Sequence, residues 1–171
     1  MADKKEPAKE AAPGASAPQG DANTPRATIV NQYVKDLSFE NPNAYEVFKA
    51  FAGATPKIDV AIDINGTKKS DDAYEVELKF TVTTQQDETS AFVIELVYAG
   101  LFAVQNMPEE AAQPFLHIQA PFILFPFARR VIADVTRDGG YPPLMLDPID
   151  FSALYQQRME VEAAKQASAN A

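Results

Sequence analysis

The sequence predicts an α+β fold, in which a four-stranded antiparallel sheet has one long and one short helix packed on one of its faces. Two observations predict it. Four segments between Tyr33 and Tyr98 alternate apolar and polar residues with period two, and after Gly100 the apolar residues follow helical spacing instead. Period-two alternation is typical of strands with one buried and one solvated face, whereas helical spacing is typical of amphipathic helices.

The four predicted strands cover Tyr33–Glu40, Lys57–Ile64, Tyr74–Thr83 and Phe92–Tyr98. In the first strand we expect Tyr33, Leu37 and Phe39 on one face, opposite Val34, Asp36, Ser38 and Glu40. We expect Asn65-Gly66 and the polar residues up to Ser70 to form the turn to the third strand, and Gln85 to Glu88 to lead into the fourth. Short connections of this kind predict antiparallel pairing.

The solvated face of this sheet is predicted to be acidic, because seven acids project away from the core: Asp36, Glu40, Asp59, Asp63, Glu75, Glu77 and Glu95. A solvated surface explains such charges, and so does a docking surface for a basic partner. The residues alone leave both interpretations open.

The long helix is predicted from about Pro114 to Asp138, and Gly139-Gly140 ends it. It carries two apolar stripes, one of Ile118, Phe122, Phe125 and Ile132 and one of Leu124, Ala128, Val131 and Val135. The sheet can cover one stripe, so a partner chain or a ligand must cover the other. A shorter helix is predicted to begin at Asp150 as N-cap, with Phe151, Leu154, Tyr155 and Met159 on one apolar side.

Composition bounds the organisation of the 171 residues. Residues 1–27 are rich in Ala and Pro without an aromatic side chain, which predicts a disordered tail before a domain at 28–160, and residues 161–171 are expected to be a flexible C-terminal tail. The formal net charge of −9 makes nucleic acid an unsuitable partner. A signal peptide contains an apolar run, and the N-terminal residues show none, so a cytoplasmic location is expected. The uncharged stretch Ala111–Ala128 contains three prolines, so direct membrane insertion is not expected.

Catalytic chemistry has little basis in this chain. It has no Cys and a single His117, which excludes thiol nucleophiles and metal sites built from several His residues. Nucleophile-elbow and dinucleotide-binding motifs are also absent from the sequence. We therefore expect a protein that is not an enzyme, with neither cofactor nor metal.

Besides the acidic face of the sheet, the sequence is rich in aromatic residues, which can be grouped by what they could bind. Phe48 and Phe51 lie in what is predicted to be the loop after the first strand, while Phe122, Phe125 and Phe151 lie on the predicted helices. Core packing and an oligomer interface explain many such residues. Alternatively, they line a groove for extended apolar peptide, where large side chains give affinity with little demand on sequence.

Four strings resemble the SecB family of bacterial protein-export chaperones: YVKDLSFENPN at 33–43, YEVEL at 74–78, ILFPFAR at 123–129 and YPPLMLDPIDF at 141–151. The likeness covers approximately Asn31 to Gln157 in the right order. The resemblance implies a dimer of dimers and an ATP-independent holdase that keeps precursors unfolded and delivers them to the SecA ATPase. It further implies SecA binding at Asp36, Glu40 and Glu95, and client binding around Phe48, Phe51, Phe122, Phe125 and Phe151.

Two other functions remain open on the residues alone. One is a chaperone of the same fold that serves another system, such as a toxin–antitoxin pair. The other is a small-molecule or lipid-binding protein with an internal apolar pocket.

Overall fold

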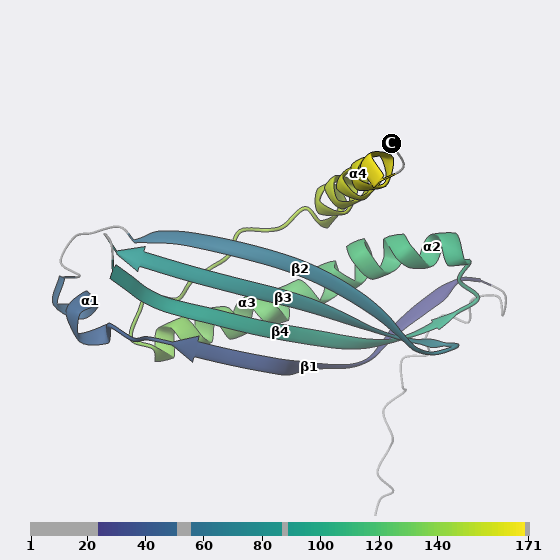
Figure 1. Ribbon diagram of the computed structural model, residues 1–171. Coiled ribbons are helices and arrows are strands. Elements are labelled where there is room, and N and C mark those ends of the chain that lie inside the picture. Colours follow the sequence, from purple (N-terminus) through teal and green to yellow (C-terminus); the bar gives the residue numbers. More distant parts are fainter. Residues whose placement is uncertain (1–23, 51–55, 87–88, 170–171) are drawn as a thin grey trace, which may run out of the picture.

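The computed structural model describes residues 24–50, 56–86 and 89–169. Four long strands form one antiparallel sheet in the order β1-β4-β3-β2 (Figure 1). The strands are β1 (Arg26–Glu40), β2 (Lys57–Ser70), β3 (Ala73–Gln86) and β4 (Thr89–Gln105). The predicted α+β class and antiparallel sheet are confirmed, although every strand is longer than its alternating segment, and β4 continues through Gly100.

The connection from β2 to β3 differs from the prediction. Ser70 pairs with Ala73, so the turn consists of Asp71 and Asp72, and Asn65-Gly66 lies inside β2. A Cβ atom at Gly66 would lie 3.2 Å from Leu116 Cβ, so the glycine leaves room for a helix rather than making a turn. Of the other predicted connection, Gln85 to Glu88, the first two residues belong to β3, and residues 87–88 lie outside the described residues.

β1 contains an irregularity that reverses part of its predicted facing. Val34 pairs with Tyr98 of β4 and Asp36 pairs with Val97, which leaves Lys35 as an extra residue in β1. Tyr33 therefore shares a face with Asp36, not with Leu37 as strict alternation predicted, and Val34 shares the face of Leu37.

The helical part of the chain begins earlier than predicted. α2 (Glu109–Pro114), a π-helical segment η1 (Phe115–Gln119) and α3 (Ala120–Asp138) follow one another without a break. α3 ends as predicted, at Gly139 and a left-handed Gly140 with φ of 88°. The predicted loop after the first strand contains a short helix, α1 (Ala44–Ala50), which carries Phe48.

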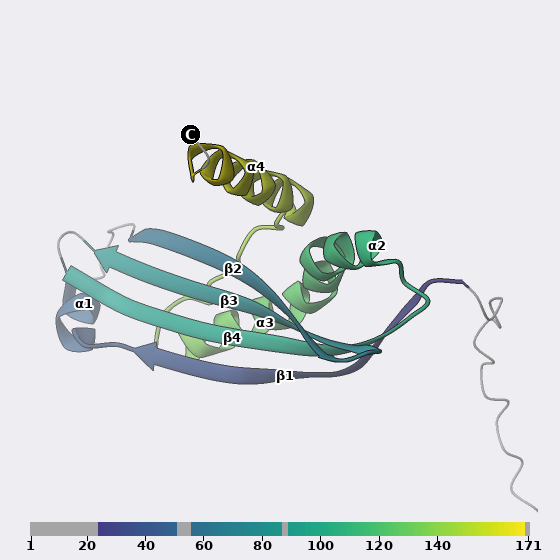
Figure 2. The same cartoon turned by 45° about the vertical axis from the view of Figure 1, so that its right-hand side comes forward.

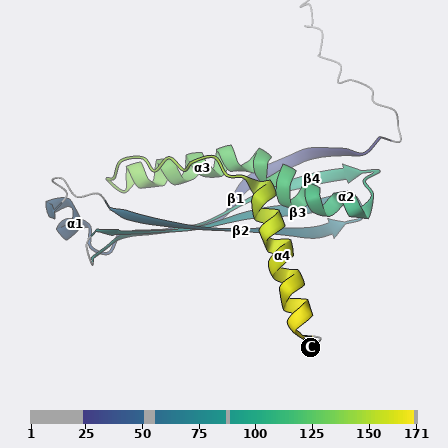
Figure 3. The ribbon, with the colours of Figure 1, turned by 90° about the horizontal axis from the view of Figure 1, so that it is seen from above.

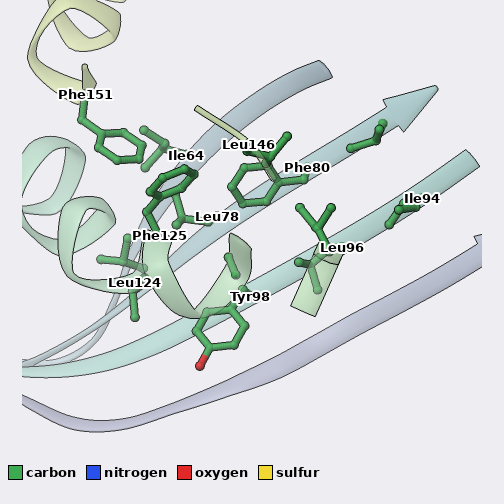
Figure 4. Close-up of a cluster of buried hydrophobic side chains, with 14 of the residues drawn as sticks. Ile64, Leu78, Phe80, Ile94, Leu96, Tyr98, Leu124, Phe125, Leu146 and Phe151 are labelled. Atoms are coloured by element: carbon green, nitrogen blue, oxygen red, sulfur yellow. The ribbon is translucent and has the colours of Figure 1, made fainter. Parts of the chain in front are cut away.

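One face of the sheet packs against α3, which runs along it in Figure 3. The core lies in this layer, and Figure 4 shows Leu124 and Phe125 of α3 near Leu78 and Phe80 of β3. The buried stripe of α3 combines members of both predicted stripes, because Leu124, Phe125, Ala128 and Ile132 all face the sheet. The outward-facing apolar residues are Phe122, Ile123 and Phe127.

α4 (Phe151–Ala169) begins where predicted, since Asp150 Oδ1 accepts a hydrogen bond of 3.0 Å from the Ala153 backbone N–H. The helix is as long as α3 and projects beyond the β2 edge of the sheet (Figure 2). Residues 161–169, predicted to be a flexible tail, continue this helix. In the part of the chain that the structure describes, no helix is both long and apolar enough to cross a membrane.

Candidate functional site

The face of the sheet that α3 leaves uncovered carries an exposed acidic cluster, formed by Asp36, Glu40 and Glu95. Glu95 of β4 lies opposite Ser38 of β1, so Asp36 and Glu40 are its two diagonal neighbours. Diagonal neighbours on one face are about 7–8 Å apart. Within the described residues no ion pair engages any of these three acids. The cluster therefore presents three carboxylates to solvent at strand spacing.

Two other acids predicted for this face are buried instead. Lys35 Nζ lies 2.8 Å from Glu75 Oε2 and also bonds Glu77, while Lys69 Nζ lies 2.8 Å from the same Glu75 oxygen. Tyr33 donates a hydrogen bond from its hydroxyl to Glu75. The side chains of Glu75 and Glu77 are only 7% and 11% exposed. These two carboxylates are already satisfied within the chain, so they are poor contacts for a partner.

The same contacts set the protonation of the pair. The hydrogen bonds from Lys35, Lys69 and Tyr33 lower the pKa of the Glu75 carboxyl to about 2. The hydrogen bond from Lys35 also lowers the pKa of Glu77, and the bond to Glu75 raises the pKa of the Tyr33 hydroxyl. Hydrogen bonds and nearby cations favour the charged form of a carboxylate. Both acids therefore stay ionised at neutral pH despite their burial.

The predicted client-binding phenylalanines divide into exposed and buried groups. Phe122 is 70% exposed on α3, and Phe48 is 43% exposed on α1, where its ring lies 5.0 Å from that of Tyr141. Phe125 and Phe151 are 7% and 3% exposed and pack edge to face with centroids 5.9 Å apart. Phe51 lies outside the described residues. A side chain must be exposed to contact a client directly. Phe48 and Phe122 meet this condition, whereas Phe125 and Phe151 are buried.

Two open hollows flank the helix side of the sheet. One, of about 570 Å³, is bordered by Phe122 and Ile123 of α3 and by Ile149–Ser152 at the start of α4. The other, of about 350 Å³, lies between Ile58, Val60 and Ile62 of β2 and the segment Leu144–Ile149.

The sequence reasoning missed the second hollow. Ile58, Val60 and Met145 are each at least 40% exposed beside it. A sequence signal was present, because β2 has apolar residues at every second position from Ile58 to Ile64 and LML at 144–146 is an apolar run in a proline-rich loop.

His117 has a structural setting. Its Nδ1 lies 3.1 Å from the carbonyl oxygen of Gln113, and its ring lies 5.5 Å from that of Tyr155 in α4. Among the described residues, no three His, Asp or Glu side chains are grouped so as to hold a metal ion.

The described geometry offers two binding surfaces, one acidic and one apolar, on opposite sides of one sheet.

A family model for SecB, the preprotein translocase subunit, matches residues 20–162. The chain belongs to the SecB family. The protein-export protein SecB of Sphingopyxis alaskensis is 50% identical over 149 residues, which cover 87% of this chain and 86% of the relative. The protein of the same name from Zymomonas mobilis subsp. mobilis is 53% identical over 136 residues, which cover 80% and 82% of the two chains.

A solved structure also shares the SecB fold. It is the Mycobacterium tuberculosis Rv1957 SecB-like chaperone in complex with a ChAD peptide from the Rv1956 HigA1 antitoxin. The TM-score is 0.57 at 20% sequence identity, over 72% of this chain and 91% of that one. At this identity the likeness concerns the fold alone. The resemblance to the SecB family that four sequence strings indicated is confirmed by the family match and by relatives near 50% identity.

Proposed function

We propose that this protein is an ATP-independent holdase of the cytoplasm, which binds unfolded precursor proteins and delivers them to the SecA ATPase for export. In this proposal the protein binds other proteins and does not catalyse a chemical reaction. The relatives at 44–53% identity are named protein-export protein SecB, which favours export over a dedicated toxin–antitoxin role.

One observation carries the proposal: exposed acids and exposed aromatic residues lie on opposite sides of the same sheet. Asp36, Glu40 and Glu95 occupy the side without helices, whereas Phe122 and the two hollows occupy the side with α3. An acidic face steers a basic partner, and apolar hollows bind extended chain with little sequence demand. SecA and a client can therefore be held at the same time.

The protein acts as a homotetramer, a dimer of dimers, because the described residues of a single chain leave two apolar regions uncovered. The outer side of α3 exposes Phe127 at 40%, and the free edge strand β1 exposes Val30 at 61% and Val34 at 43%. Long edge strands with apolar side chains pair readily with another chain, and monomers rarely expose large apolar patches.

Charge reversal on the acidic face tests the docking half of the proposal. Asp36→Lys with Glu40→Lys should lower SecA affinity, and added salt should weaken the complex of the unmodified protein by screening. A matched control is Asp59→Lys with Asp63→Lys, because these acids have the same spacing on β2 and face the same side. Binding measured by calorimetry should fall strongly in the first variant and little in the second.

The outcomes separate docking from general charge. Equal losses in both variants would show that only the overall charge matters, and no loss in either would remove the acidic face as the SecA site. Client holding, measured as suppressed aggregation of an unfolded precursor, should persist in both variants because the hollows lie across the sheet.

A further inference from the structure

Tyr141 follows the two glycines that end α3, and hydrogen bonds hold this residue through both its backbone and its hydroxyl group. Its backbone N–H donates to the Thr136 carbonyl oxygen at 3.1 Å. Its hydroxyl donates to Asn41 Oδ1 at 2.8 Å and also lies 3.3 Å from the carbonyl oxygen of Ala91 in β4. Tyr141 is only 6% exposed. The ring between these contacts is therefore held in one position, as is usual for a buried tyrosine whose hydroxyl has partners.

Tyr141 contacts the region of α1 at two points, because α1 and the end of α3 lie at the same end of the sheet (Figure 1). Its hydroxyl binds Asn41, which lies in the short connection from β1 to α1. Its ring lies 5.0 Å from the ring of Phe48 in α1. A Cβ atom at Gly140 would lie 3.0 Å from Phe48 Cζ, so the glycine leaves room for the Phe48 ring. The neighbouring Val47 is 2% exposed and packs in the core. α1 is therefore held both through Val47 and through Tyr141.

We propose that Tyr141 is a positioning residue for client binding: its hydroxyl holds the entry to α1 through Asn41, and its ring supports Phe48, so that the exposed part of Phe48 meets an apolar client segment. This inference rests on the proposed client contact at Phe48. Phe48 keeps 43% of its surface exposed while its ring rests against Tyr141. A binding group that is already fixed loses less conformational entropy when its partner arrives. Tyr141 therefore contributes to client affinity through Phe48.

Tyr141→Phe tests the hydroxyl, because it removes the bond to Asn41 and keeps the ring against Phe48. The affinity for an unfolded reporter, α-lactalbumin with its disulfides reduced and carboxymethylated, should fall about two- to tenfold, which matches the net contribution of one hydrogen bond. Asn41→Ala removes the acceptor and should weaken binding in the same way. Tyr98→Phe is the matched control, because it makes the same change at a tyrosine of β4 that is also 6% exposed. It should leave the affinity unchanged.

Amide hydrogen exchange separates positioning from a general loss of stability. The Val47 N–H donates to the Asn43 carbonyl oxygen at 3.0 Å and reports on α1, whereas Leu96 lies in the central strand β4. In Tyr141→Phe, exchange at Val47 should become faster and exchange at Leu96 should stay as in the unmodified protein, because only α1 is released. Equal acceleration at both amides, or none at Val47, would overturn the proposal. Affinities are measured well below the unfolding temperature of each variant, and light scattering checks its assembly.

A double-mutant cycle with Phe48→Ser separates this proposal from the client contact on which it rests. If Phe48→Ser leaves the reporter affinity unchanged, client contact at Phe48 is wrong, and Tyr141 has no role in client binding through it. If Phe48→Ser weakens binding and Tyr141→Phe does not, the client contact stands and the positioning role of Tyr141 is wrong. If both weaken binding, the effect of Tyr141→Phe should disappear in the Phe48→Ser background, and independent losses would contradict the proposal.

Discussion

Gly100 of β4 and Leu124 of α3 are in direct contact, and a Cβ atom at Gly100 would lie 2.7 Å from Leu124 Cδ2. Leu124 is completely buried, so it has little room to move away. Real Cβ atoms essentially never come this close to another side chain. The absence of a side chain at position 100 therefore sets how closely α3 approaches the sheet.

Gly100→Ala should destabilise the protein by about 1–3 kcal/mol, the usual cost of overpacking a core. Chemical denaturation at fixed protein concentration measures this. Gly66→Ala is the matched control, because its Cβ would lie 3.2 Å from Leu116 Cβ, a tighter than ordinary contact that requires a smaller shift. Unchanged stability of Gly100→Ala would show that α3 can move away from β4 at little cost.

Acid should weaken the fold through Glu75. Its pKa is about 2 in the folded protein against an ordinary value of 4.5, so its contribution is complete above pH about 4.5 and is lost as the pH falls toward 2. The contribution is about 1–3 kcal/mol, reduced from the full shift because Lys35 and Lys69 are 41% and 45% exposed. Glu75→Gln should flatten the dependence of unfolding free energy on pH in this range.

The control for this acid effect is Glu160→Gln, which alters an exposed acid on α4. It should leave the pH dependence as in the unmodified protein. A profile that is as steep in Glu75→Gln as in the control would mean that other groups cause the acid sensitivity.

The sequence predicted the elements well and the local irregularities poorly. Strict alternation placed Tyr33 with Leu37, because a bulge leaves no mark in the periodicity of β1. Asn65-Gly66 has the composition of a turn, yet its glycine serves the contact with Leu116 in η1. Both errors arise where packing with a distant segment overrides a local preference.

The candidate site was predicted in part for the same reason. The exposed acids follow from period two, so Glu95, Asp36 and Glu40 were correctly placed on one face. The burial of Glu75 depends on Lys35, which is 40 residues away, and spacing alone does not reveal such a pair. Helical spacing likewise does not say which of two stripes meets the sheet, so Phe125 was grouped with Phe122 although only Phe122 is exposed.

Client holding should depend on Phe122 and not on Phe127, although both are exposed phenylalanines of α3. Phe122 borders the hollow at the start of α4, whereas Phe127 is not among the residues that border it. Phe122→Ser should weaken suppression of precursor aggregation while light scattering still shows the proposed tetramer. Phe127→Ser should instead shift the oligomer toward smaller species, because we propose that this side chain lies in the subunit interface.

Phe125→Ala completes the comparison as a core variant on the same helix. Phe125 is 7% exposed and packs between Phe80 and Phe151, so its loss should cost about 3–5 kcal/mol of stability. Loss of holding in this variant would therefore follow unfolding, which thermal melting detects. If Phe122→Ser holds clients as well as the unmodified protein does, the hollow beside α4 is not part of the client site, and the one between β2 and Leu144–Ile149 becomes the site to test.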